Sequence, residues 1–123
     1  MFDHIGIRTA NLERAVAFYR ATLASLGHVV GSTGADYAGI GPAGAPCLWL
    51  HAAGRATGGV HVAFRAADRA AVDAMHAAGL AAGGRDNGAP GLRPDYGANY
   101  YAAFLIDPDG NNIEAVCLAP AAG

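Results

Sequence analysis

The segment HIGIRTAN at residues 4–11 returns 57 residues later as HVAFRAAD at residues 61–68. The two segments agree position by position: His, a β-branched residue, a small residue, a large apolar residue, Arg, a small residue, Ala, and Asn or Asp. An alanine-rich composition explains the matching alanines, but it does not easily place two histidines and two arginines in register. A repeat at a fixed distance indicates a duplicated structural unit.

Each copy predicts a strand, a helix cap and a helix. In the first copy, isoleucines alternate with small or polar neighbours, which is typical of a half-buried strand. Asn11 is a favourable N-cap, and the apolar residues after it recur at steps of three and four up to Leu26, which indicates one face of a helix. Gly27 follows where a helix end favours glycine. In the second copy, Asp68 is the cap of a shorter helix that is predicted to end at Gly79.

Short strand-like runs follow each predicted helix, and Asp107-Pro108-Asp109-Gly110 is a strong turn signal between the last two. The runs are residues 28–33, 36–40 and 47–51 in the first half, and residues 80–85, 99–106 and 111–118 in the second. The sequence therefore predicts an α+β fold of two βαβββ modules in a single domain over residues 1–123, with module one at 1–56 and module two at 57–123. The Gly- and Pro-rich stretch Asp86–Ala98 is long for a connector and is predicted to be a functional lid.

Composition excludes several classes of protein. Of the 123 residues, 53% are apolar and 15% are charged, which is typical of a folded domain, and the net charge of −2 gives no reason to expect nucleic acid or an anionic membrane as partner. No apolar run approaches the roughly 18–20 residues of a membrane-spanning helix, and the N-terminus does not resemble a signal peptide. Two cysteines and no such signal favour a cytoplasmic location. The absence of lysine excludes Schiff-base chemistry and a Walker-type phosphate loop.

Three side chains are predicted to meet on one face of the sheet. Side chains alternate across a strand, so His4 and His61 lie opposite the apolar residues that face the helices, and Glu114 shares their face in the last strand. A single strand histidine is usually structural, but two in register beside the only strand glutamate favour a site with two histidines and one carboxylate, which leaves open positions on a metal ion. The remaining histidines, His28, His51 and His76, are predicted to lie on the surface.

The sequence also resembles a known family. The segment FLIDPDGNNIE at residues 104–114, the opening FDHIGI at residues 2–7 and the helical stretch Ala17-Phe18-Tyr19 are similar to the vicinal oxygen chelate superfamily. This superfamily includes glyoxalase I, extradiol dioxygenases, fosfomycin-resistance thiol transferases, methylmalonyl-CoA epimerase and bleomycin-binding proteins. The resemblance covers nearly the whole chain.

The resemblance implies a fold and a set of ligands. Paired βαβββ modules form a mixed sheet that curls around a cavity, and His4, His61 and Glu114 match the ligands of a divalent metal ion (Zn, Fe, Mn or Ni), with Glu114 also the expected catalytic residue. Small members of the family are homodimers with two sites, often shared between subunits, so a homodimer is expected here.

One position departs from glyoxalase I, which has a fourth ligand, a glutamate, on the last strand of its first module. The matching residue here is about Trp49, which cannot bind a metal, and His51 would replace it only if the strand slipped by two residues. A site with three protein ligands is closer to the dioxygenases and the fosfomycin enzymes.

Two functions of different classes follow. The first is a metal-dependent enzyme (a lyase, thiol transferase or dioxygenase) that chelates a small oxygenated substrate through two neighbouring oxygens. The second is a metal-free protein of the bleomycin-resistance type that sequesters a small molecule.

Strand parity puts Tyr100 and Phe104 on one face, and the family suggests that it is the cavity face. The candidate substrate-binding residues are Trp49, Tyr100, Phe104 and, as an anion contact, Arg65, with Arg93, Asp95 and Tyr96 in the predicted lid.

Overall fold

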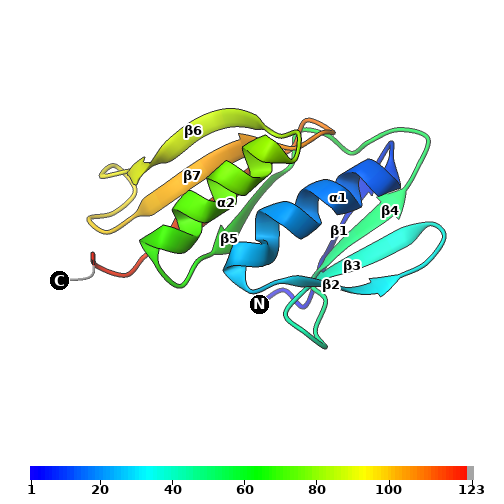
Figure 1. The fold of residues 1–123 in the computed structure, drawn as a ribbon, viewed down its shortest axis with the longest axis horizontal. Coiled ribbons are helices and arrows are strands. Elements are labelled where there is room, and N and C mark those ends of the chain that lie inside the picture. Colours follow the sequence, from blue (N-terminus) through cyan, green and yellow to red (C-terminus); the bar gives the residue numbers. More distant parts are fainter. Residues whose placement is uncertain (122–123) are drawn as a thin grey trace.

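The computed structural model describes residues 1–121 and has two βαβββ modules in one α+β fold (Figure 1). The first module consists of β1 (Ile5–Thr9), α1 (Leu12–Leu23), the short 3₁₀ helix η1 (Ala24–Leu26), β2 (Val29–Thr33), β3 (Tyr37–Gly41) and β4 (Leu48–Ala52). The second consists of β5 (His61–Arg65), α2 (Arg69–Ala81), β6 (Arg85–Leu92), β7 (Tyr101–Ile106) and β8 (Asn112–Cys117). The predicted fold class is confirmed.

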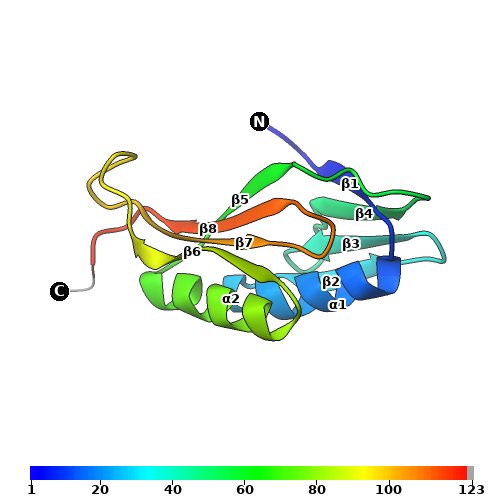
Figure 2. The same ribbon diagram turned by 90° about the horizontal axis from the view of Figure 1, so that it is seen from above.

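The two modules form two four-stranded sheets of the same topology. The strand orders are β1-β4-β3-β2 and β5-β8-β7-β6, and in each sheet the first pair is parallel while the other pairs are antiparallel. Both helices lie on one side of the sheets, and the opposite side carries no helix (Figure 2). The face that is expected to hold the site is therefore the open face of both sheets.

One core joins the modules under the helices. Ile7, Leu48 and Leu50 of the first sheet are buried against α1, and the core continues through Met75 of α2 to Ile113 of β8. The two helices pack against each other across the boundary between the modules (Figure 1). Burying the predicted apolar face in this way leaves the alternate residues of each strand for the open face. Neither helix within residues 1–121 is long and apolar enough to cross a membrane.

The predicted caps form in the structure. The Asn11 side chain accepts a hydrogen bond from the Arg14 amide at 3.0 Å, and the Asp68 side chain accepts one from the Ala71 amide at 2.8 Å. Helix α2 runs to Ala81, past Gly79, so the prediction that it ends at Gly79 and that a strand begins at residue 80 is wrong. The glycine is a packing residue, because a Cβ there would collide with the Leu105 side chain.

The predicted lid is mostly a strand. Residues Arg85–Leu92 form β6, which is an edge strand, so the missing N–H of Pro90 costs little there. The pairing with β7 shifts register on both sides of Gly88, whose φ of +151° favours glycine. Glycine and proline are tolerated at such bulges, and they make this strand resemble a loop in the sequence. Only the segment 93–100, with a turn closed by the Tyr96 amide and the Arg93 carbonyl at 2.9 Å, remains a connector.

A buried carboxylate ties the first helix to the turn before β8. Asp107 is 3% exposed and its Oδ1 accepts hydrogen bonds from the amides of Asp109 at 2.9 Å and Asn111 at 2.8 Å. Its Oδ2 accepts from the Asn111 side chain at 2.9 Å and from the hydroxyl of Tyr19 on α1. Burial and the Asp107 charge raise the pKa of Tyr19 well above its usual value. This network fixes the start of β8, the strand that carries Glu114.

Candidate metal centre

Glu114 is a buried carboxylate on the open side of the second sheet. It lies in β8 between Ala63 of β5 and Phe104 of β7, and it is 2% exposed. Its neighbours Ile113 and Ala115 enter the core, so the alternation of the strand directs Glu114 to the other face, as predicted. A carboxylate this deeply buried needs partners that offset the loss of water.

Both oxygens of Glu114 have such partners. His61 Nε2 lies 2.8 Å from Oε1, and the Tyr100 hydroxyl donates to Oε2. Burial, and then the hydrogen bond to Glu114, raise the pKa of Tyr100 to about 12, so this hydroxyl is a protonated donor at neutral pH. The Phe104 ring centroid lies 6.3 Å from that of His61. The structure thus brings together four of the predicted site residues: His61, Tyr100, Phe104 and Glu114.

His4 lies apart from this cluster. It precedes β1 and is exposed, and its Nδ1 lies 2.6 Å from Asp3 Oδ1. It lines a cavity of about 220 Å³ to which β5 contributes Val62, Ala63 and Phe64 but not His61. Within residues 1–121 of one chain, no three His, Cys, Asp or Glu side chains are grouped so that they could hold a metal ion.

The open face of the first sheet carries a tryptophan where the second sheet carries its carboxylate. The register pairs Gly6 with Trp49, just as it pairs Ala63 with Glu114. The Trp49 ring lies 6.1 Å from that of Tyr37 and covers Gly39, where a Cβ would be only 2.7 Å from it. Trp49 is therefore an apolar wall on this face.

Two further residues of interest, His51 and Arg65, are exposed at the ends of strands. His51 is exposed, as predicted, and its ring lies over Gly6, because a Cβ at Gly6 would be 3.1 Å from its Nε2. Arg65 is exposed at the end of β5 and, among the described residues, has no hydrogen-bond or ion-pair partner for its guanidinium.

The sequence model of the Glyoxalase/Bleomycin resistance protein/Dioxygenase superfamily matches residues 1–115. The chain belongs to this superfamily. It shares 33% identity and a TM-score of 0.82 with a solved glyoxalase/bleomycin resistance protein from Albidiferax ferrireducens T118, covering 95% of this chain and 98% of that one. The resemblance inferred from the sequence is confirmed. A search of curated proteins finds no significant match.

Two more distant structures share the fold. A glyoxalase/bleomycin resistance protein/dioxygenase family enzyme from Burkholderia phytofirmans PsJN is 19% identical, with a TM-score of 0.73 over 95% of this chain and 98% of that one. A glyoxalase-related enzyme from Fulvimarina pelagi is 17% identical, with a TM-score of 0.74 over 95% of this chain and 87% of that one. At these identities the likeness concerns the fold alone.

His61 and Glu114 provide the donor atoms for two coordination positions on a metal ion. Nitrogen and carboxylate ligands bind divalent zinc at about 2.0–2.2 Å, and two such ligands of a tetrahedral ion lie about 3.4 Å apart. The 2.8 Å between His61 Nε2 and Glu114 Oε1 is a hydrogen-bond distance, so an ion that binds both atoms takes the place of the shared proton and moves the two atoms slightly apart. The imidazole is 54% exposed, so the pair opens onto the face where further ligands would enter. Further protein ligands have to come from outside this cluster.

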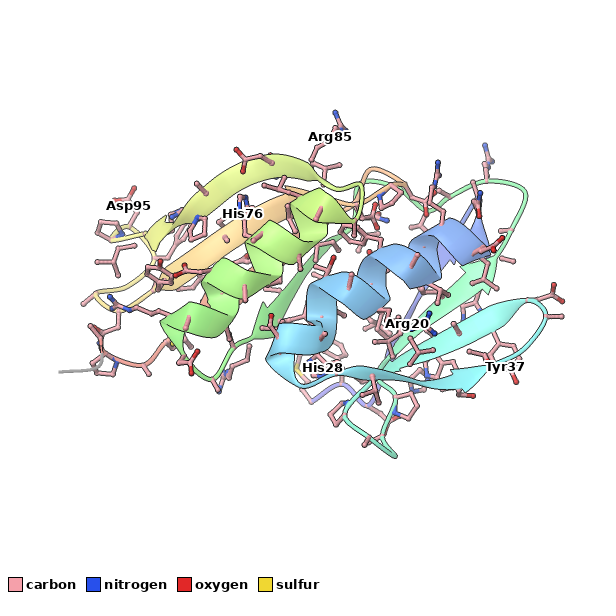
Figure 3. All side chains as sticks on the ribbon, in the orientation of Figure 1. Arg20, His28, Tyr37, His76, Arg85 and Asp95 are labelled. Carbon is pink, nitrogen blue, oxygen red and sulfur yellow. The ribbon has the colours of Figure 1, made fainter. Side chains whose placement is uncertain are left out.

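Two contacts in the structure differ from the sequence predictions, one under β6 and one near the site. The sequence predicts His76 on the surface, but this residue of α2 (Figure 3) is 9% exposed, and its Nε2 lies 2.9 Å from Asp86 Oδ1. The error follows from the unrecognised strand β6, which covers this side of α2. Arg93 was assigned to a lid, but its guanidinium lies over the Phe104 ring at 5.3 Å from the centroid. The placement of Arg93 on Phe104 depends on the bulged pairing of β6, for which the sequence has no local signal.

Proposed function

We propose that the protein is a metal-dependent enzyme that chelates two neighbouring oxygens of a small substrate on a divalent metal ion. The observation that carries this proposal is the pair of His61 Nε2 and Glu114 Oε1, 2.8 Å apart on an open sheet face. In the proposed site, His61 and Glu114 of one chain and His4 of a second chain hold the ion. A homodimer that sets module one of each chain against module two of its partner would supply this third ligand.

The exposed residues of the open face support such a dimer. His61, Ala63 and Arg65 of β5 and Gly6 and Arg8 of β1 are all exposed in the single chain. A small domain with open sheet edges gains stability by pairing across a two-fold axis, because the pairing buries these edges.

The residues of the chain have separate tasks in this proposal. A bound divalent ion supplies a Lewis acid that polarises the substrate oxygens, which is worth several kcal/mol in the transition state. Tyr100 holds Oε2 of Glu114, which fixes the direction of the carboxylate. Phe104 and Trp49 form apolar walls that exclude water from the bound substrate. The reaction class is that of a lyase, a thiol transferase or a dioxygenase.

A second function is supported by one observation. Both oxygens of Glu114 are already hydrogen-bonded by protein side chains, so the carboxylate is stable without an ion. A metal-free protein of the bleomycin-resistance type, which sequesters a small molecule, would need only this hydrogen-bonded carboxylate and no ion.

Metal analysis distinguishes the two functions. The purified protein is stripped with EDTA, reloaded with Zn²⁺, Fe²⁺, Mn²⁺ or Ni²⁺ in separate samples, desalted and examined by elemental analysis. The enzyme predicts one ion per chain for at least one of the four metals, and Glu114→Gln should lose it. Protein that remains free of all four metals would refute the enzyme and support the sequestering protein.

A further inference from the structure

A polar cavity lies beside the His61–Glu114 pair on the open face of the second sheet. Its volume is about 320 Å³, and it is lined by Asn87, Gly88, Arg93, Tyr96, Phe104 and Asn112. Asn112 is the register partner of His61, and Phe104 is the register partner of Glu114. The cavity therefore adjoins the proposed metal site and shares Phe104 with it, but its polar residues have no role in that site.

Arg93 is held in place as a positive charge without a negative partner. Its Nη1 donates to the Gly91 carbonyl at 2.8 Å and its Nη2 to the Ala89 carbonyl at 2.7 Å. Among residues 1–121, no carboxylate forms an ion pair with it, and three of its five N–H groups have no hydrogen-bond partner. The guanidinium carbon also lies over the Phe104 ring, 5.3 Å from its centroid, which is within the range of a cation–π contact.

Gly88 provides the space for this arrangement. A Cβ at Gly88 would lie 2.9 Å from Phe104 Cδ1 and 3.2 Å from Arg93 Nη2. The other polar groups of the cavity are amides and a phenol: Asn87 Nδ2 donates to Asn112 Oδ1 at 3.2 Å, which leaves the Asn112 amide N–H groups as donors. No acidic residue lines the cavity. A fixed guanidinium with amide donors and no acid is a binding site for an anionic oxygen group.

We propose that this cavity binds a carboxylate of the substrate. The planar fork of a guanidinium matches the geometry of a carboxylate, and its single positive charge balances one carboxylate but not a doubly charged phosphate. The proposal rests on the proposed function for the other end of the ligand. Phe104 lies between the two ends, 6.3 Å from the His61 ring and 5.3 Å from the Arg93 guanidinium. A short-chain acid across the Phe104 ring would thus place its vicinal oxygens at His61 and Glu114 and its carboxylate at Arg93.

The first test needs no metal. EDTA-treated, ¹⁵N-labelled protein is titrated with glutarate at constant ionic strength, and the Arg93 Nε–H signal is followed by NMR. We expect a saturable shift of this signal in the wild type, no binding in Arg93→Gln and weakened binding in Arg93→Lys, which keeps the charge but not the fork. Arg85→Gln is the matched control, because Arg85 is exposed at the start of β6, the strand that Arg93 follows, and points away from the molecule (Figure 3).

Three results would overturn the proposal: no saturable shift in the wild type, equal glutarate binding in Arg93→Gln, or tighter binding of inorganic phosphate than of glutarate. The wild-type titration decides even if the variants fail to fold. If the protein binds no metal, the proposed function fails while this test stands.

The second test uses the metal-loaded protein and a matched pair of five-carbon acids. 2-Oxoglutarate and 2-oxopentanoate share the vicinal oxygens, but only the first has a distal carboxylate. The wild type should bind 2-oxoglutarate at least about tenfold more tightly, and Arg93→Gln should bind both equally. Equal affinities in the wild type would contradict the two-ended ligand.

Discussion

Glu114 shows how a single residue can have two uses in one site. A carboxylate that is 2% exposed normally lowers stability unless it is hydrogen-bonded, and here His61 and Tyr100 each take one oxygen. The same two contacts orient the carboxylate toward the open face. The consequence is that loss of the negative charge should affect metal binding far more than folding.

Replacing Glu114 by Gln should lower metal affinity sharply and abolish activity. Gln keeps the volume but removes the anionic donor. The free energy of unfolding should change by about 1 kcal/mol, because the NH₂ group that replaces one carboxylate oxygen cannot accept that oxygen's hydrogen bond. Elemental analysis after identical loading checks this result. Glu13→Gln is the control, since Glu13 is exposed in the first turn of α1, and it should change neither property. Equal metal content in Glu114→Gln and wild type would sink the assignment of Glu114 as a ligand.

Replacing Tyr100 by Phe tests the group that holds the carboxylate. The ring and its contact with Tyr96, at 5.3 Å between centroids, are retained, while the hydroxyl that binds Oε2 is lost. We expect metal affinity to fall by roughly 10-fold, the size of effect seen when a residue that orients a ligand is removed. Calorimetric titration of stripped protein with Zn²⁺ measures it.

Tyr101→Phe is the matched control for this experiment. The Tyr101 hydroxyl contacts Asp73 of α2 at 2.7 Å, on the other face of the sheet, so its loss should leave Zn²⁺ affinity unchanged. If both variants bind Zn²⁺ like the wild type, Tyr100 does not position Glu114.

At the scale of elements, the link between α1 and the turn before β8 is a buried hydrogen-bond network centred on Asp107. The sequence identified Asp107 and Asp109 only as turn residues. The structure adds Tyr19, 88 positions earlier in the chain, as a donor to the same carboxylate. No local pattern links residues so far apart, so this part of the fold could not be predicted from the sequence.

The network predicts a loss of stability in alkali. The folded pKa of Tyr19 is raised above its ordinary value of 10.0, by burial and by Asp107, so the folded state keeps a proton that the unfolded state releases. The contribution is complete below pH 10 and is lost as pH rises above it, with a slope of at most about 1.4 kcal/mol per pH unit for one proton. In Tyr19→Phe the free energy of unfolding should fall less steeply above pH 10. Urea unfolding from pH 8 to 11 measures the two slopes, and identical slopes would contradict the prediction.

Local signals predicted most of the elements, and tertiary pairing decided the rest. The sequence correctly predicts the helix caps at Asn11 and Asp68 and the alternation in the strands, because these features depend on residues close together in the sequence. Strand β6 was missed because Gly88 and Pro90 suppress strand propensity, and only its pairing with β7 makes it a strand. The proximity of His61 and Glu114 is predictable from the sequence, because the two residues lie on paired strands of one module.

At the scale of the molecule, the two modules leave equivalent faces open. His4 opens the first module as His61 opens the second, yet within residues 1–121 of a single chain His4 does not meet His61 or Glu114. The repeat in the sequence predicts equivalent positions in the two modules, but it contains no information on which chain supplies each module to a site. The proposed homodimer places His4 of each chain at the His61–Glu114 pair of its partner.

A mixed dimer tests this arrangement directly. His4→Ala and Glu114→Gln each remove one ligand from every site of their own homodimers, so neither variant alone should bind metal in the shared arrangement or within a single chain. When the two variants are unfolded together and refolded as a mixture, a two-fold dimer that shares its sites has one doubly defective site and one intact site in each heterodimer. Random pairing makes half of the dimers mixed, so metal content should recover to roughly a quarter of the wild-type value. Sites built within one chain would give no recovery, and light scattering that shows only monomers at micromolar concentration would exclude the shared site altogether.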